Sequence, residues 1–274
     1  MSNIVIDEMV CTHCDTCATI CPSGIIEQGD DGTLPSIRTE NEQACIECGH
    51  CEATCPTGAL KLQDPEGQPS TLTKDQPSIA PEALGVYLQS RRSVRHYQQK
   101  PVARETIEKV MEIVRYAPSG ANRQPVQYII ITDPVEVKHL ASLIIDWMQE
   151  ELAADSPVSR MLPLQHLIDA WNRGQDPICR GAPHLLIAHT PAENPSAQVD
   201  AIIALTYGDV TLPAFGIGAC WAGFLTVAVN ASEKVRQALK LPAGRVYQFG
   251  LLFGYPKYPV HNIPSRKAVS IEWR

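Results

Sequence analysis

The sequence predicts a small cysteine-rich domain followed by a larger domain of mixed helices and strands. Three observations predict this organisation: eight of the ten cysteines lie between residues 11 and 55, a polar, proline-rich stretch follows them, and apolar residues then recur with helical and strand periods. The chain has 274 residues, 44% of them hydrophobic, so it can bury a core in one large domain or in two smaller ones.

The composition argues against nucleic acid and membranes as partners. The 23 basic and 30 acidic residues give a net charge of −7, which offers no broad positive surface to a phosphate backbone or an anionic bilayer. The N-terminal residues lack a basic, apolar leader pattern, and no stretch reaches the roughly 18 apolar residues of a membrane-spanning helix. We therefore expect a cytoplasmic protein.

The cysteines form one pattern that occurs twice. The run C-x2-C-x2-C-x3-C-P begins at Cys11 and again at Cys45, 34 positions later. In a reducing cytoplasm, cysteines at such density indicate metal binding rather than disulfides. A structural zinc site usually pairs one C-x2-C with a distant second one, whereas three thiolates in close succession suit three corners of a [4Fe-4S] cluster. The spacing thus favours two iron–sulfur clusters over zinc.

With all eight cysteines and both following prolines present, residues 1–63 resemble a bacterial-type two-cluster ferredoxin. In that family the last cysteine of each motif binds the cluster of the other motif. The resemblance implies one cluster on Cys11, Cys14, Cys17 and Cys55, and a second on Cys45, Cys48, Cys51 and Cys21. The apolar residues of this part are too few for a core of their own, so cluster binding must hold the unit together.

Residues 64–82 are predicted to be a linker between a first domain at 1–63 and a second at 83–274. The linker is rich in proline, glutamine, serine and aspartate and has hardly any apolar residue, which is typical of an extended, semi-stiff connection.

The second domain shows the periods of helices and strands in turn. Apolar residues at 107, 110, 111 and 114 follow the helical period, and residues 126–132 form a β-rich apolar run. We expect further strands at 184–189 and 247–254, and helices at about 199–218 and at 232–240, the last of these with Ser232 as N-cap.

Three patches of this domain suit a phosphate-bearing ligand. They are RRSVR at 91–95, APSGANRQP at 117–125 and PSRK at 264–267. Arginine binds phosphate with two parallel hydrogen bonds, and a turn such as PSGAN can hold a polar ligand with its amides. Any one patch alone is better explained as a solvated surface or a connecting turn than as a ligand site.

In this order, and with the glycine-rich run GIGACWAGF at 216–224, the patches resemble the nitroreductase family of FMN flavoproteins over residues 85–274. The resemblance implies an α+β class fold of three layers, α/β/α. It also implies a homodimer with FMN bound at the interface between the two subunits.

The resemblance assigns roles residue by residue. The phosphate and ribityl chain are expected to contact Arg91, Arg92, Ser93 and Arg95, with Arg266 and Lys267 completing the phosphate site. The flavin ring is expected along Pro118, Ser119, Ala121, Asn122 and Gln124, with the backbone of Ala222 and Gly223 at its N5 atom. No side chain is assigned a catalytic role, because the chemistry is carried by flavin N5.

The sequence departs from the family pattern on the substrate side. Some members carry glutamate at the position of Ala222, and an aromatic residue at that of Val126, so substrate preference does not transfer. The insert at about 135–180 could form a lid or a dimer arm, or pack as ordinary helices. Cys179 and Cys220 have no partner at metal spacing and are interpreted as buried small apolar residues.

Together the two halves predict an FMN-dependent oxidoreductase that receives electrons through two [4Fe-4S] clusters and reduces a small organic acceptor, such as a nitroaromatic, a quinone or an activated alkene. The expected donor is a soluble one, ferredoxin, flavodoxin or NAD(P)H. Two alternatives stay open: NAD(P)H reduces FMN directly while the clusters serve as an accessory exit or entry, or the chain is a non-catalytic redox relay or sensor.

Overall fold

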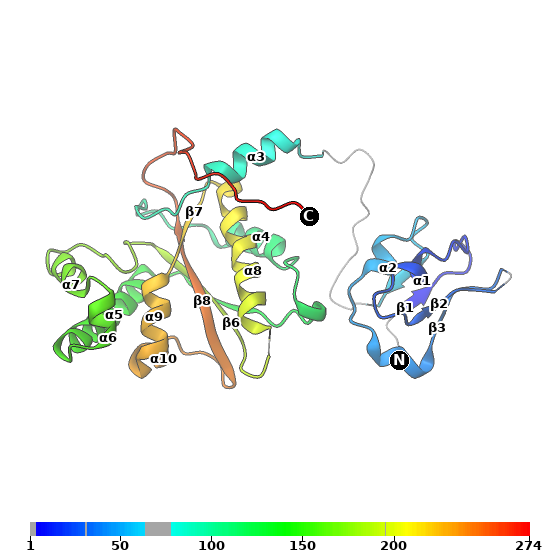
Figure 1. Cartoon of the computed structure of the whole chain (residues 1–274), viewed down its shortest axis with the longest axis horizontal. Coiled ribbons are helices and arrows are strands. Elements are labelled where there is room, and N and C mark those ends of the chain that lie inside the picture. Colours follow the sequence, from blue (N-terminus) through cyan, green and yellow to red (C-terminus); the bar gives the residue numbers. More distant parts are fainter. Residues whose placement is uncertain (1–3, 31, 64–77, 195) are drawn as a thin grey trace. The chain divides into compact units, whose positions relative to one another are not determined.

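The computed structural model describes residues 4–30, 32–63, 78–194 and 196–274. Contacts divide the chain into two compact units: Met1–Ser78 with Gly120–Arg123, and Ile79–Ser119 with Gln124–Arg274. Most of the predicted linker lies outside the described residues, so its bounds stay a prediction. The described chain resumes shortly before helix α3 (Pro81–Ser90) (Figure 1).

The first unit consists of two small antiparallel strand pairs and short helices. Strand β1 (Ile4–Ile6) pairs with β4 (Leu60–Leu62), and β2 (Ile26–Glu27) pairs with β3 (Ser36–Ile37). The helices are α1 (Thr16–Ile20), α2 (His50–Ala53) and a 3₁₀ turn (Thr39–Ala44). The buried cluster holds only Ile4, Ile25, Ile26, Cys51 and Leu60. So small a core agrees with the expectation that bound clusters stabilise this unit.

The backbone of the first unit repeats with the period of its cysteine motifs. Three positions with left-handed φ recur 34 residues later, namely His13 and Glu47, Asp15 and Gly49, and Gly24 and Gly58. Non-glycine residues adopt this conformation rarely. The two motifs therefore fold into the same loop, as their identical spacing predicts.

The second unit is built on one antiparallel sheet with the strand order β5-β6-β8-β7. The strands are β5 (Gln127–Ile131), β6 (His184–Pro191), β7 (Gly218–Trp221) and β8 (Arg245–Gly254). The strands predicted at 184–189 and 247–254 are confirmed as β6 and β8, which are the two central strands of the sheet. The strand predicted at 126–132 is confirmed as β5.

Helices cover both faces of this sheet and make three layers (Figure 1). Leu186 and Ala188 of β6 pack in one cluster with α4 (Arg104–Val114) and α8 (Ala197–Thr211). Leu185 and Ile187, on the opposite face of the strand, belong to a second cluster with helices α5, α7, α9 and α10. These span Pro134–Ala153, Leu164–Asn172, Gly223–Ala231 and Glu233–Ala238. The α+β class and the α/β/α layering are confirmed.

One predicted helix is too long. The helix expected at 199–218 ends at Thr211, a 3₁₀ turn follows (Leu212–Phe215), and β7 begins at Gly218. Pro213 removes a backbone donor, and Gly216 takes a left-handed φ of 71° that ends the helical run. The predicted cap of α10 is confirmed, because the Ser232 hydroxyl accepts a hydrogen bond from the Val235 amide at 3.4 Å.

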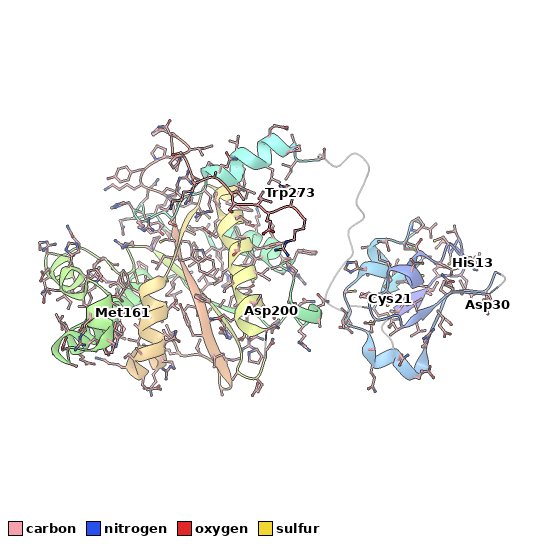
Figure 2. All side chains as sticks on the ribbon, viewed as in Figure 1. His13, Cys21, Asp30, Met161, Asp200 and Trp273 are labelled. Carbon is pink, nitrogen blue, oxygen red and sulfur yellow. The ribbon has the colours of Figure 1, made fainter. Side chains whose placement is uncertain are left out.

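The insert at 135–180 packs as ordinary helices. The α5 side chains of Ile144 and Trp147 are 0% and 4% exposed, and they lie in the same apolar cluster as Leu164 of α7. The short helix α6 (Pro157–Met161) between them ends at Met161, whose side chain is exposed (Figure 2). The described residues include no helix long and apolar enough to cross a membrane.

Replacing Ile144 with alanine is expected to destabilise the second unit by about 2–5 kcal/mol, because it leaves a cavity in the core that the surrounding helices cannot fill. Met161→Ala is the matched control, since that side chain is 82% exposed and its loss is expected to change stability by less than about 0.5 kcal/mol. Denaturant unfolding of both variants measures the difference. Equal stabilities would contradict this account of the core.

Candidate cofactor sites

Two cavities of the first unit are lined by the eight motif cysteines. Each cavity takes three cysteines from one motif and the last cysteine of the other. One is lined by Cys11, Cys14, Cys17 and Cys55, and the second by Cys45, Cys48, Cys51 and Cys21. These are the two sets that the ferredoxin resemblance implies.

The cavities suit a cluster better than a single ion. A zinc ion with four bonds of about 2.3 Å needs its sulfur ligands within roughly 4 Å of one another. No three histidine, cysteine or acidic residues in the described part of the chain are placed to hold one metal ion. The remaining walls are largely apolar, with Ile4, Ile25 and Leu62 in one cavity and Ile6, Pro35 and Leu60 in the other. Four thiols around a small apolar space fit a [4Fe-4S] cluster.

Burial raises the pKa of the Cys51 thiol to about 11, so without a cluster this side chain is protonated at neutral pH. A metal ligand must be the thiolate, and cluster assembly at Cys51 therefore releases a proton. The Cys14 thiol is exposed, and its hydrogen bond with Thr16 at 3.3 Å lowers its pKa.

In the second unit, the arginine motif is fastened to the edge strand of the sheet. The Val94 amide donates a hydrogen bond to the Ala219 carbonyl of β7 at 2.8 Å, and Ser93 and Ala219 form a parallel bridge. Gly218 permits this close approach, because a Cβ atom there would lie 2.3 Å from Val94 Cγ2. Gly218 of the GIGACWAGF run thus allows the arginine motif to pack against β7.

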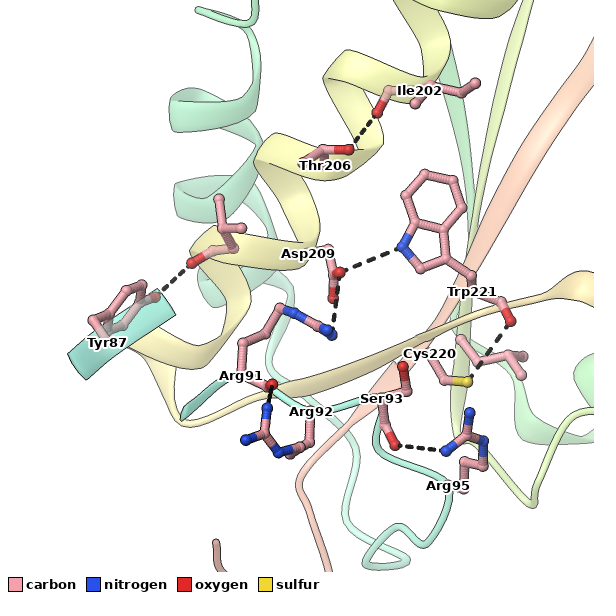
Figure 3. A network of polar contacts seen from close by, with 12 residues as sticks. Tyr87, Arg91, Arg92, Ser93, Arg95, Ile202, Thr206, Asp209, Cys220 and Trp221 are labelled. Carbon is pink, nitrogen blue, oxygen red and sulfur yellow. Dashed lines mark hydrogen bonds and ion pairs between the residues drawn. The ribbon is translucent and has the colours of Figure 1, made fainter. Parts of the chain in front are cut away.

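A buried carboxylate holds the first of these arginines (Figure 3). Asp209, at the end of α8, lies 3.4 Å from the guanidinium of Arg91 and accepts a hydrogen bond from Trp221 Nε1 at 3.3 Å. Burial raises the pKa of Asp209, and the Arg91 charge and the Trp221 hydrogen bond oppose that rise. The carbonyl of Arg91 in turn accepts a hydrogen bond from Arg92 at 2.6 Å. Asp209 therefore links Arg91 of the arginine motif to Trp221, which directly precedes Ala222 and Gly223.

The structure brings Arg91, Arg92 and Arg266 into the wall of one cavity of about 570 Å³. Ile263, Pro264 and Ser265 complete its C-terminal side, so the PSRK patch meets the RRSVR patch although they are far apart in sequence. Lys267 is exposed and does not line this cavity. Three of the six residues predicted for the phosphate end are thus neighbours.

Arg95 lies in a different place from the other motif arginines. It donates a hydrogen bond to the Ser93 carbonyl at 3.4 Å and lines a separate, larger cleft that also contains Arg180. Arg180 was missed by the sequence analysis, because it belongs to none of the motifs. Cys179 and Cys220 are buried as expected, with exposures of 1% and 8%.

The APSGANRQP segment at 117–125 carries three non-glycine residues with left-handed backbone, namely Ala121, Asn122 and Gln124, at φ values of 50°, 51° and 46°. Such conformations are costly and collect at ligand-binding turns. The Ser119 hydroxyl accepts a hydrogen bond from the Gln124 amide at 2.9 Å and closes the turn. Of the residues predicted along the flavin in this segment, Ala121 and Asn122 belong to the first unit, and Pro118, Ser119 and Gln124 belong to the second.

The two backbone groups expected at the flavin differ in availability. The Ala222 amide donates to the Gly250 carbonyl at 2.9 Å and is therefore occupied. Gly223 opens helix α9, where the first amides have no partner within the helix, and no described residue accepts from its amide. A Cβ atom on Gly223 would meet no atom within 4 Å. Of the two, only Gly223 presents a free donor to open space.

Comparison with known sequences supports the family resemblance of both parts of the chain. The Nitroreductase family profile matches residues 88–255, and the 4Fe-4S dicluster domain profile matches residues 10–60. An iodotyrosine deiodinase of Nematostella vectensis is 25% identical over 177 residues, covering 62% of this chain and 65% of the relative. An FMN reductase [NAD(P)H] of Bacillus subtilis is 28% identical over 180 residues, covering 62% and 64%. The chain thus spans less than two thirds of these relatives.

Solved structures agree on the fold. A nitroreductase with bound FMN from Bacteroides fragilis has a TM-score of 0.57 at 22% identity, covering 70% of this chain and 98% of that one. At such identity the likeness shows the architecture alone. The family profile, in contrast, covers more than half of the chain. The chain belongs to the nitroreductase family and carries a 4Fe-4S dicluster domain at residues 10–60.

Proposed function

We propose that this protein is an FMN-dependent oxidoreductase that takes electrons through two [4Fe-4S] clusters and reduces a small organic acceptor of nitroaromatic, quinone or activated alkene type. The observation that carries the proposal is that one chain holds both two complete four-cysteine cavities and a cavity walled by three motif arginines. The former suits one-electron carriers, and the latter suits a phosphate.

FMN is the cofactor that the second unit fits. Arg91, Arg92 and Arg266 would hold its phosphate, and the free Gly223 amide would donate to N5. When bound, FMN supplies a centre that accepts electrons singly and delivers two of them as a hydride. The related Bacteroides structure contains FMN, and the Bacillus relative is an FMN reductase, which supports this choice.

In this proposal the residues of this chain bind and orient FMN, and they do not transfer protons. Asp209 keeps Arg91 in place, and the occupied Ala222 amide fixes the segment that carries Gly223. An acceptor that takes a hydride also needs one proton to complete a two-electron reduction. We assign that proton to water or to the substrate, because the motifs place no acid or base beside Gly223.

A homodimer is part of the proposal. Leu84, Val86 and Leu88 of α3 are 43–58% exposed, and Trp273 near the C-terminus is 88% exposed (Figure 2). Exposed apolar side chains on one helix and near the C-terminus are the features that support a surface covered by a partner.

A reduced ferredoxin or flavodoxin is the donor we propose, in a cytoplasmic setting where the thiols stay reduced. The second candidate function is direct reduction of FMN by NAD(P)H, with the clusters as an accessory exit or entry, and the Bacillus FMN reductase [NAD(P)H] favours it. A redox relay or sensor without a small-molecule acceptor is the third.

Anaerobic purification followed by iron, sulfide and flavin analysis tests the cofactor assignment, with about eight iron atoms and one FMN expected per chain. Turnover of a nitroaromatic, a quinone and an activated alkene under reduced ferredoxin then tests the activity. A protein with full cofactors that reduces none of the three would favour the relay or sensor.

Two glycine variants separate the placement of the arginine motif from the space at the flavin. Gly218→Ala is expected to lower the melting temperature, because its Cβ would overlap Val94, and to weaken FMN binding as the arginines move. Gly223→Ala is expected to keep the melting temperature of the apoprotein, because its Cβ meets no protein atom within 4 Å. It is expected to weaken FMN binding alone, because the added methyl group would enter the space in which we propose the flavin lies. Thermal unfolding of the flavin-free proteins, with a flavin titration of each, distinguishes the two. Unchanged FMN affinity in Gly223→Ala would contradict a flavin at that amide.

A further inference from the structure

The second unit contains a cleft of about 1260 Å³ that the motifs do not explain. Its walls come from α5, α7, the segment at 174–182 and the loop at 95–99. The cationic side chains among its walls are Arg95, Lys138 and Arg180, and His96 and His166 also line it. The volume is ample for a small organic molecule.

The positive charge of this cleft is not neutralised by the protein. Its single acidic residue is Asp176, whose carboxylate accepts hydrogen bonds from the amides of Ile178, Cys179 and Gly181 at 3.0, 2.8 and 2.9 Å. In the described part of the chain, none of the three cationic side chains forms an ion pair. Three cations thus collect in one cleft of a protein whose net charge is −7.

Asp176 also fixes the backbone that presents Arg180. Arg180 and Gly181 both have a φ of 62°, which is common for glycine and costs a residue with a side chain about 1–2 kcal/mol. The three hydrogen bonds to Asp176 hold this turn closed around Arg180. A strained position occupied by arginine rather than glycine points to a use for its side chain.

The same cleft has an apolar wall. Val135 and Val137 of α5 and Leu167 and Trp171 of α7 line it beside the cations. Such a combination suits a ligand with an anionic group on an apolar or aromatic body, because the arginines bind the anion and Trp171 and the aliphatic side chains bury the rest.

The cleft borders the segment proposed to lie at the flavin. The guanidiniums of Arg95 and Arg180 both lie near the Cys220 thiol, where they oppose the burial that raises the pKa of that thiol. Cys220 precedes Ala222 and Gly223 by two and three residues on the same run. Arg95 itself belongs to the RRSVR motif.

We propose that this cleft binds the electron acceptor, and that the acceptor is a small molecule joining a carboxylate or phosphate to an apolar, aromatic body. The proposal rests on the proposed function, which it deepens by naming the substrate class. Lys138 and Arg180 are the specificity residues, since they hold no other assigned role.

Calorimetric titration of the FMN-loaded protein tests the ligand chemistry without turnover. The probes are 4-nitrobenzoate, 4-nitrophenyl phosphate and neutral 4-nitrobenzyl alcohol, and the two anions distinguish carboxylate from phosphate. We expect the better anion to bind about tenfold tighter than the alcohol, and less tightly at high salt. Equal binding of all three probes would overturn the proposal.

Lys138→Gln and Arg180→Gln are each expected to weaken binding of the anion by about tenfold and to leave binding of the alcohol unchanged. Lys109→Gln on α4 is the matched control, because Lys109 is exposed and lies outside the cleft. Flavin content and melting temperature show whether each variant is folded. If Arg180→Gln does not fold, Lys138→Gln on the exposed side of α5 decides alone. A loss as large in Lys109→Gln as in Lys138→Gln contradicts the assignment.

Steady-state reduction of the three probes separates this proposal from the proposed function. Turnover of all three with a lower KM for the anion supports both, and turnover with equal KM values overturns the cleft assignment only. Selective anion binding without any turnover supports the cleft and counts against the enzyme activity.

Discussion

Replacing Cys14 and Cys55 together is expected to leave about half of the iron, whereas replacing Cys14 and Cys51 together is expected to remove nearly all of it. The reason is the exchange of the last cysteine between motifs. Cys14 and Cys55 line one cavity although 41 positions separate them, and Cys51 lines the other. Two alanines in one cavity damage one cluster, while one alanine in each cavity damages both.

Iron analysis after anaerobic reconstitution measures this difference, and electron paramagnetic resonance identifies the surviving cluster. Cys14→Ala and Cys55→Ala should leave the same spectrum, and Cys21→Ala and Cys51→Ala should leave the other. The flavin content should stay at the wild-type level in all of them, because the cysteines and the motif arginines belong to different units. Pairing within each motif would instead give Cys14→Ala and Cys55→Ala different spectra.

Arg91→Ala is expected to weaken FMN binding by about 1–3 kcal/mol, which corresponds to roughly ten- to hundredfold in the dissociation constant. Arg91 lines the cavity with Arg92 and Arg266, and Asp209 keeps its guanidinium in place. Riboflavin lacks the phosphate, so its affinity should be unaffected by the same substitution. Fluorescence titration of the apoprotein with both flavins measures the two effects.

Two further variants sharpen this test. Arg115→Ala serves as the control, because Arg115 is exposed at the C-terminal end of α4 and, among the residues that the structure describes, its ion pair is with Glu112. Arg91→Ala and Arg266→Ala combined should lose less than the sum of the single effects, since both would contact one phosphate. If riboflavin and FMN lose equal affinity in Arg91→Ala, the arginine supports the fold and does not bind the phosphate.

The sequence predicted most of the fold because the decisive signals are local. Eight cysteines at fixed spacing define the first unit, and the alternation of Leu185 and Leu186 between two cores shows why 184–189 was recognisable as a strand. The helix predicted at 199–218 was too long, because the apolar run over these residues is compatible with a helix. In the structure this run contains Gly216, which ends the 3₁₀ turn that follows α8, and Gly218, which begins the next strand.

Only those residues of the candidate site that belong to a sequence motif could be predicted. Arg91, Arg92 and Arg266 line one cavity, and their contact with a phosphate stays a prediction. Asp209 could not be predicted as their neighbour, because an aspartate in a mostly apolar helix carries no motif. Arg180 was missed for a similar reason, since only the folded turn around Asp176 shows that it lines a cleft. Nor could the sequence show that Gly250 occupies the Ala222 amide, because that hydrogen bond joins distant parts of the chain.

Anaerobic stopped-flow reduction of the bound flavin tests the central claim most directly. Wild-type protein and the Cys14→Ala/Cys51→Ala variant, both loaded with FMN, are mixed with chemically reduced ferredoxin while flavin absorbance is followed. We expect rapid bleaching in the wild type and much slower bleaching in the variant that lacks the clusters. Equal rates in the two proteins, or rapid bleaching of the variant by NADH or NADPH, would contradict electron supply through the clusters.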